Sequence, residues 1–338
     1  MGHMPLTPAP RSSSAGLLPG IVLSLLIAIA CILINRLVPI LSPLLLAIIA
    51  GAVLANLGVL PTRAHPGLDF SAKQLLRAGI VLLGLQLSLQ DIAGLGAGMI
   101  AVVVLIVAVG LVATIWLGAR LGLSWSQRIL IGCGFSICGA AAVAAADGVV
   151  EADEEEVASS IALVVVFGTA MIAIIPILAT LLGLDDRTAG LWAGGSIHEV
   201  AQVVAAAGAI GGGALSVAVI VKLARVLMLA PVMAAISIWQ RYRTTASPKA
   251  GARPPLIPLF VLGFLFMVLI ASGFDIPTQV STTAKYLQTA LLSAAMFALG
   301  CGVRRDALKA VGVKPVALAG AATGVVMVVS LVGVLLVG

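Results

Sequence analysis

The segment LSVAVIVKLARVLMLAPVMAAISIW, from Leu215 to Trp239, decides how this chain folds. It is apolar and exceeds the roughly 20 residues that a membrane-spanning helix needs, yet Lys222 and Arg225 lie one helical turn apart near its centre. A charge at the bilayer centre costs about 2.5–3.5 kcal/mol on insertion scales. The two cations must therefore face a protein interior, a wet cavity or a partner, and such a pair is a candidate functional site.

The composition places the whole chain in the membrane. Hydrophobic residues make up 61% of it and charged residues 9%, whereas soluble domains carry about 25% charged residues. The apolar runs are continuous and do not alternate, which predicts transmembrane helices and not a β-barrel. The basic residues behind the net charge of +6 lie in short loops, where they set topology, so we expect no nucleic-acid partner. Because the cysteines form no CxxC pair, we expect no metal site and no cofactor.

The apolar runs give a topology. Residues 1–16 are interpreted as an expression scar, MGHM, followed by a disordered tail, and residues 17–338 as one transmembrane domain. Eleven runs have spanning length: 18–35, 40–59, 72–90, 97–119, 127–149, 158–182, 189–209, 214–239, 256–273, 283–303 and 315–337. The positive-inside rule then puts the strongly basic loops and the N-terminus in the cytoplasm. Lys73 and Arg77 are interpreted as interfacial anchors.

Two segments of the chain echo each other. GFSICGAAAVAAAD covers Gly134–Asp147, and GSIHEVAQVVAAAG covers Gly195–Gly208. A weaker echo links LLGLQLSLQDI (82–92) with ALGCGVRRDAL (298–308). These echoes indicate an inverted-repeat secondary transporter, in which the repeats run in opposite directions.

The count of crossings has two solutions. Both echoing segments are long enough to span, so eleven crossings are our first expectation. In the alternative, both are re-entrant hairpins that enter from opposite sides, which leaves nine crossings and restores the inversion. The basic loops keep their side in either solution.

Glycines near the two echoes predict broken helices at the membrane midplane. Glycine weakens a helix by about 1 kcal/mol relative to alanine. A broken helix frees backbone groups that bind ions, and the half-helix N-termini favour anions. We therefore expect substrate-binding residues at Ser136, Cys138 and Gly139 in the first echo and at Ser196 in the second. The alternative is that the glycines only allow close helix packing.

Polar residues follow Ser196 directly. His198 and Gln202 are i, i+4 neighbours on a helix, and Glu199 and Gln202 are i, i+3 neighbours, so the three can share one face. Glu199 and His198 could bind and release a proton, or Glu199 could ligate sodium. The alternative for His198 is a buried histidine that is satisfied by the backbone. Because position 202 is Gln, the HExxH metal motif is absent.

Lys222 and Arg225 have two interpretations. The guanidinium offers a planar donor fork that suits oxyanions, and the ammonium offers a compact charge, so the pair could bind an anion. Alternatively, the two cations form a structural ion pair with Glu199 or Asp147. Enzymatic activity is not expected, because the chain has no GxSxG elbow, P-loop or dinucleotide fingerprint and no sizeable soluble loop.

At these motifs the chain resembles a bacterial family. The segments LLRAGIVLLGLQLSLQDI, GFSICGAAAVAA, GGSIHEVAQVVAAAG and VIVKLARVLMLAPV resemble the inner-membrane proteins described as sulfate exporters of the YeiH type, over most of residues 20–338. The resemblance implies a multi-pass protein of the bacterial inner membrane that belongs with the bile-acid/arsenite/riboflavin transporter superfamily. It implies inverted five-helix repeats, a panel and a core domain, and crossed broken helices at 136–142 and 196–202. The echoes here are not two clean sequential repeats, and in this the chain departs from that pattern.

The leading hypothesis is a secondary active transporter of a small anion, such as sulfate or an organic sulfonate, coupled to protons or sodium. Lys222 and Arg225 would neutralise the anion, while Ser136, Ser196 and Gln202 would hydrogen-bond it and His198 with Glu199 would carry the coupling. The alternatives are a passive anion channel and a membrane scaffold subunit without transport. The sequence leaves homodimer formation open.

Overall fold

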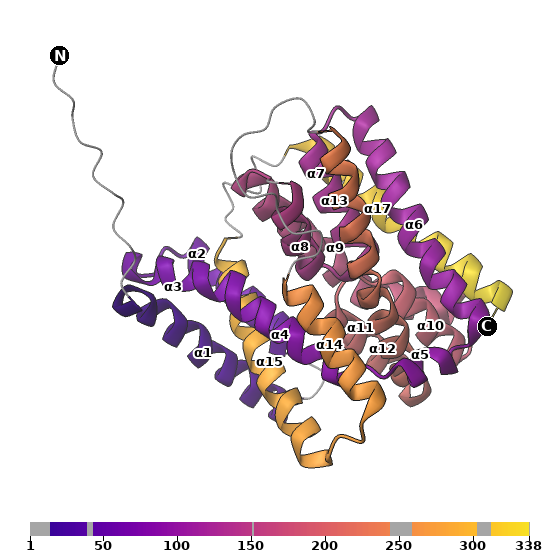
Figure 1. The fold of residues 1–338 in the computed structure, drawn as a ribbon, viewed down its shortest axis with the longest axis horizontal. Helices are drawn as coiled ribbons and strands as arrows, with labels where there is room; N and C mark the ends of the chain where they lie inside the picture. Colours follow the sequence, from indigo (N-terminus) through magenta and orange to yellow (C-terminus); the bar gives the residue numbers. More distant parts are fainter. Residues whose placement is uncertain (1–13, 39–42, 151, 244–258, 303–311, 338) are drawn as a thin grey trace.

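The computed structural model describes residues 14–38, 43–150, 152–243, 259–302 and 312–337, and the regular structure within them is entirely helical (Figure 1). Among these described residues, five helical stretches are long and apolar enough to cross a membrane: Gly16–Leu37, Gly96–Arg120, Glu154–Leu181, Gly213–Gln240 and Val313–Val337. The prediction of an all-helical polytopic membrane protein is confirmed. The predicted tail before residue 14 and most of the basic loops, at 244–258 and 303–311, lie outside the described residues.

The elements follow one another with short connections. In chain order they are α1 (Ser14–Leu37), α2 (Pro43–Asn56), η1 (Thr62–Ala64), α3 (His65–Phe70), η2 (Ser71–Leu75), α4 (Leu76–Leu83), η3 (Gly84–Gln86), α5 (Leu89–Gly94), α6 (Gly96–Arg120), α7 (Trp125–Cys133), η4 (Gly134–Cys138), α8 (Ala140–Val150), α9 (Glu154–Leu181), α10 (Asp186–Ser196), α11 (Val200–Ile210), α12 (Gly212–Leu227), α13 (Leu229–Arg243), α14 (Leu259–Gly273), α15 (Thr278–Cys301) and α17 (Val313–Val337).

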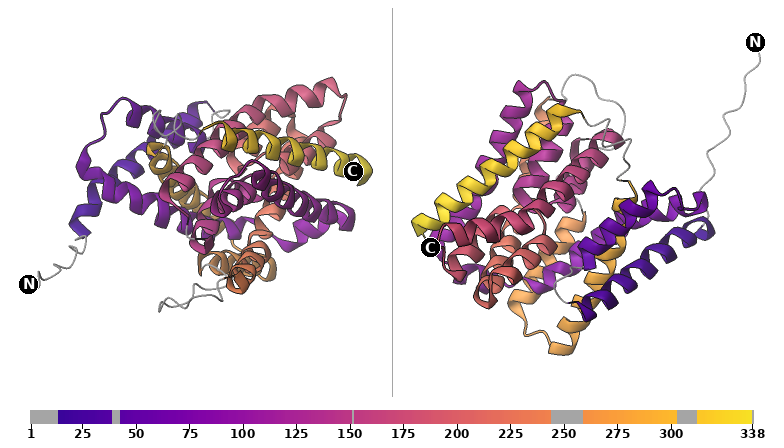
Figure 2. Two further views of the ribbon diagram at one scale, coloured as in Figure 1. Left: turned by 90° about the horizontal axis from the view of Figure 1, so that it is seen from above. Right: turned by 180° about the vertical axis from the view of Figure 1, so that it is seen from behind.

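The helices form two bundles (Figures 1 and 2). In the lateral bundle, α15 packs against α1, α2 and α4, and α14 packs against α4. In the hairpin bundle, α17 packs along α6, α10 packs against α12, and α11 packs against α9 and α12. The seam between the bundles is thinner, and it is formed where α4 meets α8 and α2 meets α11. Side chains at this seam, such as Leu76 and Ile80, are nonetheless buried.

The first hairpin, residues 125–150, consists of α7, the π-helical turn η4 and α8. The Ser124 side chain caps α7 by accepting a hydrogen bond from the backbone N–H of Gln127. The hydroxyl groups of Ser124 and Ser126 both donate to the Glu156 carboxylate, in the first turn of α9. Because α9 begins four residues after α8 ends, the hairpin returns to the end of the bundle at which it began.

The second hairpin, residues 186–210, consists of α10 and α11. Asp185 caps α10, and the backbone N–H of Thr188 donates to the Asp185 carboxylate at 3.1 Å. At the other end, Gly211 follows α11 and lies against Asp186, so that a Cβ atom at position 211 would approach the Asp186 carboxylate oxygen to 2.5 Å. The second hairpin therefore also returns to its starting end.

The geometry of these two hairpins matches the expected alternative of two hairpins, whereas eleven crossings were our first expectation. Helix α9 has 28 residues, which span about 42 Å at 1.5 Å per residue, and it joins the mouths of the hairpins at opposite ends. The first arm has the 9 residues of α7 followed by the 5 of η4, and α8, α10 and α11 have 11 residues each. Each arm is therefore shorter than the roughly 20 residues that a full crossing needs.

Candidate functional site

The tips of the two hairpins meet inside the hairpin bundle, and we call this place the tip junction. It brings together every residue that the sequence predicted for the site. Ser136, Cys138 and Gly139 lie at the tip of the first hairpin and Ser196, His198, Glu199 and Gln202 at the tip of the second, while Lys222 and Arg225 come from α12. Nearly all of these side chains are buried, and Glu199 is the half-buried exception.

Arg225 ties the two tips together from inside the junction. Its side chain is fully buried. On the first tip, Nε donates to the Ser136 carbonyl at 3.1 Å, and Nη2 donates to the Phe135 and Ser136 carbonyls at 2.9 Å each. On the second tip, Nη1 donates to Gly195 at 2.8 Å, to Ile197 at 2.9 Å and to Gly194 at 3.2 Å. All five N–H donors of the guanidinium thus point at backbone carbonyls.

Lys222, one turn before Arg225 on α12, also donates hydrogen bonds to carbonyls of both tips. Its Nζ atom donates to the Ile137 carbonyl of the first tip and to the Ile197 carbonyl of the second, both at 2.9 Å. An ammonium group has three N–H donors, so one remains beyond these two bonds. Within the described residues, neither cation makes the ion pair with Glu199 or Asp147 that was the structural alternative; their partners are backbone carbonyls.

The position of the two cations has a clear physical cause. The last turn of a helix leaves carbonyl groups without intrahelical partners and carries partial negative charge. The arms α7–η4 and α10 both end at the junction, so their unpaired carbonyls converge there. Lys222 and Arg225 satisfy these carbonyls and oppose the charge of both helix ends.

Glu199 performs the opposite task for the other two arms. Helices α8 and α11 both begin at the junction, where their N–H groups are unpaired and carry partial positive charge. The Glu199 Oε1 atom accepts a hydrogen bond from Ala140 N, at the start of α8, at 3.1 Å. The Glu199 carboxylate also caps α11 by accepting from Gln202 N, while the Gln202 Oε1 atom accepts from Glu199 N at 3.1 Å. One carboxylate therefore bridges two helix N-termini.

Gly139 makes this bridge sterically possible. Its φ of 75° lies in a region that side-chain-bearing residues rarely adopt. A Cβ atom at position 139 would also come within 2.3 Å of Glu199 Cγ. Both the turn into α8 and the approach of the carboxylate therefore require glycine at this position. The predicted break in the first echo is thus present at Gly139.

His198 links the first tip to α17. Its Nδ1 atom donates to the Phe135 carbonyl at 3.2 Å, and its Nε2 atom lies 3.1 Å from the Thr323 hydroxyl. Its ring also packs on Phe135, with 4.5 Å between the ring centroids. Because Nδ1 donates, Nε2 of a neutral ring is an acceptor, and it shares the single Thr323 hydroxyl proton with the Ala319 carbonyl, which lies 2.9 Å from that hydroxyl. The sequence analysis missed Thr323, which is distant in the chain and lies in an apolar run without any motif.

Two hydroxyl groups at the junction have no hydrogen-bond partner within the described structure. They belong to Ser136 and Ser196, and both are completely buried. Buried polar groups are nearly always paired, so an unpaired one calls for an explanation. The Ser136 hydroxyl faces α6, where a Cβ atom at Gly110 would come within 2.6 Å of it. That these hydroxyls bind substrate stays a prediction.

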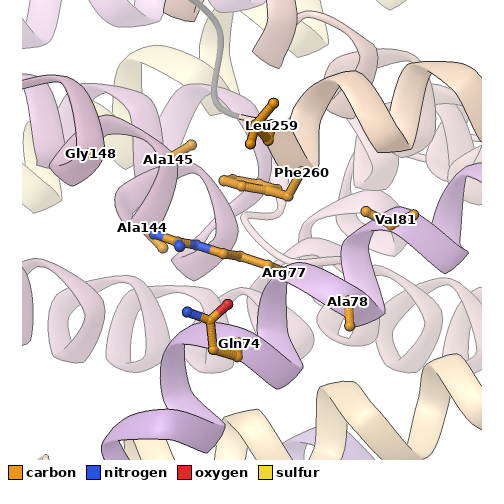
Figure 3. Close-up of a pocket in the computed structure, with 9 residues that line it drawn as sticks. All are labelled: Gln74, Arg77, Ala78, Val81, Ala144, Ala145, Gly148, Leu259 and Phe260. Carbon is orange, nitrogen blue, oxygen red and sulfur yellow. The ribbon is translucent and has the colours of Figure 1, made fainter. Parts of the chain in front are cut away.

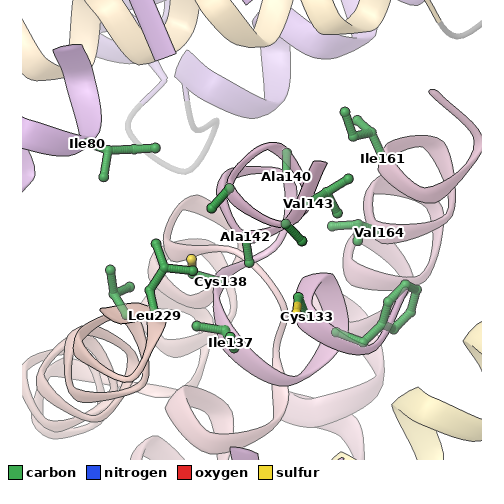
Figure 4. Packing of buried hydrophobic residues seen from close by; sticks show 14 of the residues in the cluster. Ile80, Cys133, Ile137, Cys138, Ala140, Ala142, Val143, Ile161, Val164 and Leu229 are labelled. Carbon is green, nitrogen blue, oxygen red and sulfur yellow. The ribbon is translucent and has the colours of Figure 1, made fainter. Parts of the chain in front are cut away.

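A narrow cavity of about 50 Å³ lies next to Glu199, at the seam between the bundles. Cys138, Ala141 and Glu199 line it from the hairpin bundle, and its wall in the lateral bundle is apolar, with Leu76, Ile80, Leu83 and Met296. Figure 4 shows Cys138 on the side of the hairpin toward Ile80, whereas Cys133 lies toward α9. The Glu199 carboxylate is thus the charged group of the junction that faces the seam.

Similar proteins cover nearly the whole chain. The family described as Conserved hypothetical protein 698 matches residues 19–319. A UPF0324 membrane protein of Corynebacterium glutamicum is 53% identical over 94% of this chain and 92% of its own length. The corresponding proteins of Pseudomonas aeruginosa and Agrobacterium fabrum are each 39% identical, over 92% and 88% of this chain and 91% and 87% of their own lengths. No solved structure matches the chain.

Proposed function

The chain belongs to the Conserved hypothetical protein 698 family of UPF0324 membrane proteins, and we propose that it is a secondary active transporter of a small anion. One observation carries the proposal: a carboxylate sits on the N-termini of two broken helices, beside a seam between two bundles. Broken helices whose N-termini face anionic groups are a recurring feature of transporter substrate sites. In this protein, Glu199 holds the place that the substrate anion would take.

In this proposal the Glu199 carboxylate and the substrate anion bind the same N–H groups in turn, and this exchange couples transport to protons. When Glu199 is ionised, it occupies the N–H groups of Ala140 and Gln202. When its carboxylate takes up a proton, it becomes neutral and can turn into the cavity at the seam, which leaves those donors to a substrate oxyanion. Binding of the anion and protonation of Glu199 then favour each other, and the proton travels with the anion.

The geometry supports proposed roles for the other predicted residues. Lys222 keeps one N–H donor for an anion at the tips, whereas Arg225 acts through its charge, because all its donors end on carbonyls. Gln202, Ser136, Ser196 and Cys138 are the remaining donors at the tips. His198 keeps the predicted role in coupling as a relay toward Thr323. Sulfate remains one anion within the proposed class, as the resemblance to sulfate exporters implies.

The membrane placement belongs to the same proposal. We assign nine crossings, to α1, α2, α3–α4, α6, α9, α12–α13, α14, α15 and α17, with the two hairpins entering from opposite sides as an inverted pair. The mouth of the first hairpin is cytoplasmic, because Arg120 and Arg128 lie there, and the positive-inside rule puts basic loops in the cytoplasm. At this end Trp125 stacks on Trp239, with 4.0 Å between ring centroids, as interfacial aromatic residues would. The membrane is then the bacterial inner membrane.

The test is uptake into liposomes that contain a pH-sensitive dye and the purified protein. An imposed proton gradient should drive uphill accumulation of an oxyanion or a sulfonate, and an imposed anion gradient should move protons. Glu199→Gln should still exchange anion for anion while proton movement falls to background. Glu155→Gln, which changes an exposed carboxylate at the start of α9, is the matched control and should behave as wild type.

The outcomes separate the competing functions. Anion flux that never runs uphill would support a passive channel instead. If accumulation of the anion requires sodium and the pH-sensitive dye shows no proton movement, the coupling ion is sodium and not the proton. If correctly folded protein moves no anion of the panel, the transport proposal fails and a scaffold function is favoured. If Glu199→Gln couples protons as well as wild type does, Glu199 is not the coupling group.

A further inference from the structure

A second and larger cavity opens at the seam, between α4, α8 and α14. Its volume is about 500 Å³. Arg77 and Gln74 line one side of it, Ala144 and Gly148 of α8 another, and Phe260 of α14 a third. Figure 3 shows the Arg77 side chain reaching across the cavity toward Ala144, with Phe260 above it.

Arg77 is a different kind of cation from Arg225. It is half-buried and lies at a cavity, and its guanidinium carbon sits 5.6 Å from the centroid of the Phe260 ring. Within the described residues, no protein acceptor takes a hydrogen bond from it. The Asp147 carboxylate interacts electrostatically with Arg77 and with Lys73. Arg77 thus has an oriented and unused donor fork.

The size and the walls of the cavity restrict what could bind there. A water molecule takes up about 30 Å³ of liquid, so a bare tetrahedral oxyanion would fill only a small part of the space. Apart from Arg77 and Gln74, the lining is carbon from alanine, valine, leucine, glycine and phenylalanine residues. Small-molecule sites of roughly 300–1,000 Å³ typically combine such walls with a few placed polar groups. An arginine fork matches carboxylate or sulfonate oxygens in pairs.

We propose that the Arg77 cavity is a loading site at the cytoplasmic side, which selects an anionic group on a compact apolar body, such as an alkanesulfonate or a short carboxylate, over a bare inorganic oxyanion. This inference rests on the proposed transport function and names the substrate class for it. Arg77 receives the charged end of the substrate and the alanine-rich face of α8 receives its apolar end.

Helix α8 connects this cavity to the tip junction. Ala141 lines the narrow cavity beside Glu199, and Ala144, Ala145 and Gly148 line the Arg77 cavity. These positions are spaced i, i+3, i+4 and i+7, so they lie along one face of the helix within two turns. On α4, Ile80 borders the narrow cavity and Arg77 and Val81 the larger one. The two cavities therefore lie along the same stretch of α8, within about two helical turns of each other.

The test measures binding to purified full-length protein in phosphatidylcholine nanodiscs. Propanesulfonate should raise the melting temperature, and sulfate at the same concentration should raise it less. Arg77→Gln should weaken the propanesulfonate Kd at least about tenfold, because it removes charge-assisted hydrogen bonds. Ala144→Leu, which fills the cavity without changing charge, should weaken it as well. Arg63→Gln changes an exposed arginine near η1 and should bind as wild type does. Asp147→Asn removes the competing carboxylate and should tighten binding.

Three outcomes decide the inference. If propanesulfonate binding is lost in Arg77→Gln and kept in Glu199→Gln, the loading site stands, even where the liposome assay shows no transport and the proposed function fails. If Arg77→Gln and Ala144→Leu both bind like wild type, or if sulfate binds as well as propanesulfonate, the inference is overturned. If no free anion binds, but added phosphatidylglycerol stabilises wild type and not Arg77→Gln, the cavity takes a lipid headgroup and the inference is also overturned.

Discussion

The two hairpins share a layout but contribute different chemistry. Aligning their echoes places Ser136 beside Ser196, Cys138 beside His198 and Gly139 beside Glu199. In the structure, Gly139 and Glu199 face each other: the glycine leaves the space and the adjacent backbone N–H donor, and the glutamate fills the space with a carboxylate. Both hairpins therefore supply backbone carbonyls to the junction, and the second also supplies the His198 and Glu199 side chains.

The two chain breaks differ for the same reason. The first hairpin ends its π-helical turn with a left-handed glycine, whereas the second passes through Ile197 and Glu199 in extended conformations, with ψ of 149° and 151°. An extended break can carry full side chains, and a left-handed break cannot do so easily. Only the second hairpin could therefore hold the ionisable residues, and the following predictions test this division.

The largest expected effect concerns Arg225, which serves both hairpins equally. Arg225→Ala would leave the carbonyls of Phe135, Ser136 and Gly195 unsatisfied in a dry interior. At about 1–3 kcal/mol for each buried unpaired group, we expect a loss of more than about 3 kcal/mol. Arg225→Lys should lose less, because an ammonium restores the charge without the planar fork. Melting in detergent, with the exposed Arg187→Ala as control, measures this. If Arg225→Ala has the same melting temperature as Arg187→Ala, Arg225 does not hold the two tips together.

The next effect distinguishes the two breaks. Gly139→Ala should destabilise the protein by about 1–3 kcal/mol, the usual range for a forced left-handed residue, and should also displace Glu199. Gly148→Ala is the matched control, because it lies on the same hairpin in open space. There alanine should be neutral or stabilising by about 0.5–1 kcal/mol. Equal melting temperatures for the two variants would show that the break tolerates a side chain.

A smaller effect isolates the carboxylate. Glu199→Ala removes a cap shared by two helices, and loss of a cap costs about 0.5–2 kcal/mol. Glu199→Gln keeps an acceptor oxygen and should therefore lose only part of this stabilisation. Melting curves of both variants beside wild type would measure the difference. If Gln and Ala destabilise equally, the ionised carboxylate, and not its hydrogen-bonding shape, holds the N-termini of α8 and α11.

Much of the junction could be predicted from sequence. The Ser-Ile echoes located both tips, and two cations in an apolar run had to find polar partners. The identity of those partners could not be predicted, because carbonyl groups are present at every residue and only the three-dimensional break shows which ones are unpaired. The direction of the chain after the first break was equally hidden, since the return of the first hairpin is seen only in the bonds from Ser124 and Ser126 to Glu156.

The resemblance implied a panel and a core domain, but the place of the seam between the bundles was not predictable. Sequence patterns identify helices but do not say which helices pack together or where the packing is loose. Arg77 looked like an interfacial anchor for this reason: near a span end, an arginine usually has that role. Only the approach of α8 and α14 to α4 places it at a cavity.

The smallest expected effect distinguishes the helix caps at the open ends of the two hairpins, Ser124 in the first and Asp185 in the second. The Thr188 hydroxyl and backbone N–H donate to the Asp185 carboxylate and hold its pKa below the ordinary value. The stabilisation is therefore complete above the unfolded-state pKa of about 3.9, and it is lost as the pH falls through the lowered folded-state pKa. Ser124 caps the first hairpin with a hydroxyl that does not titrate. Melting between pH 7 and pH 3 should show that Asp185→Asn removes part of the acid-dependent loss of stability that the wild type shows. If Asp185→Asn leaves the pH profile unchanged, the charge on the cap contributes nothing, and the two mouths are equivalent.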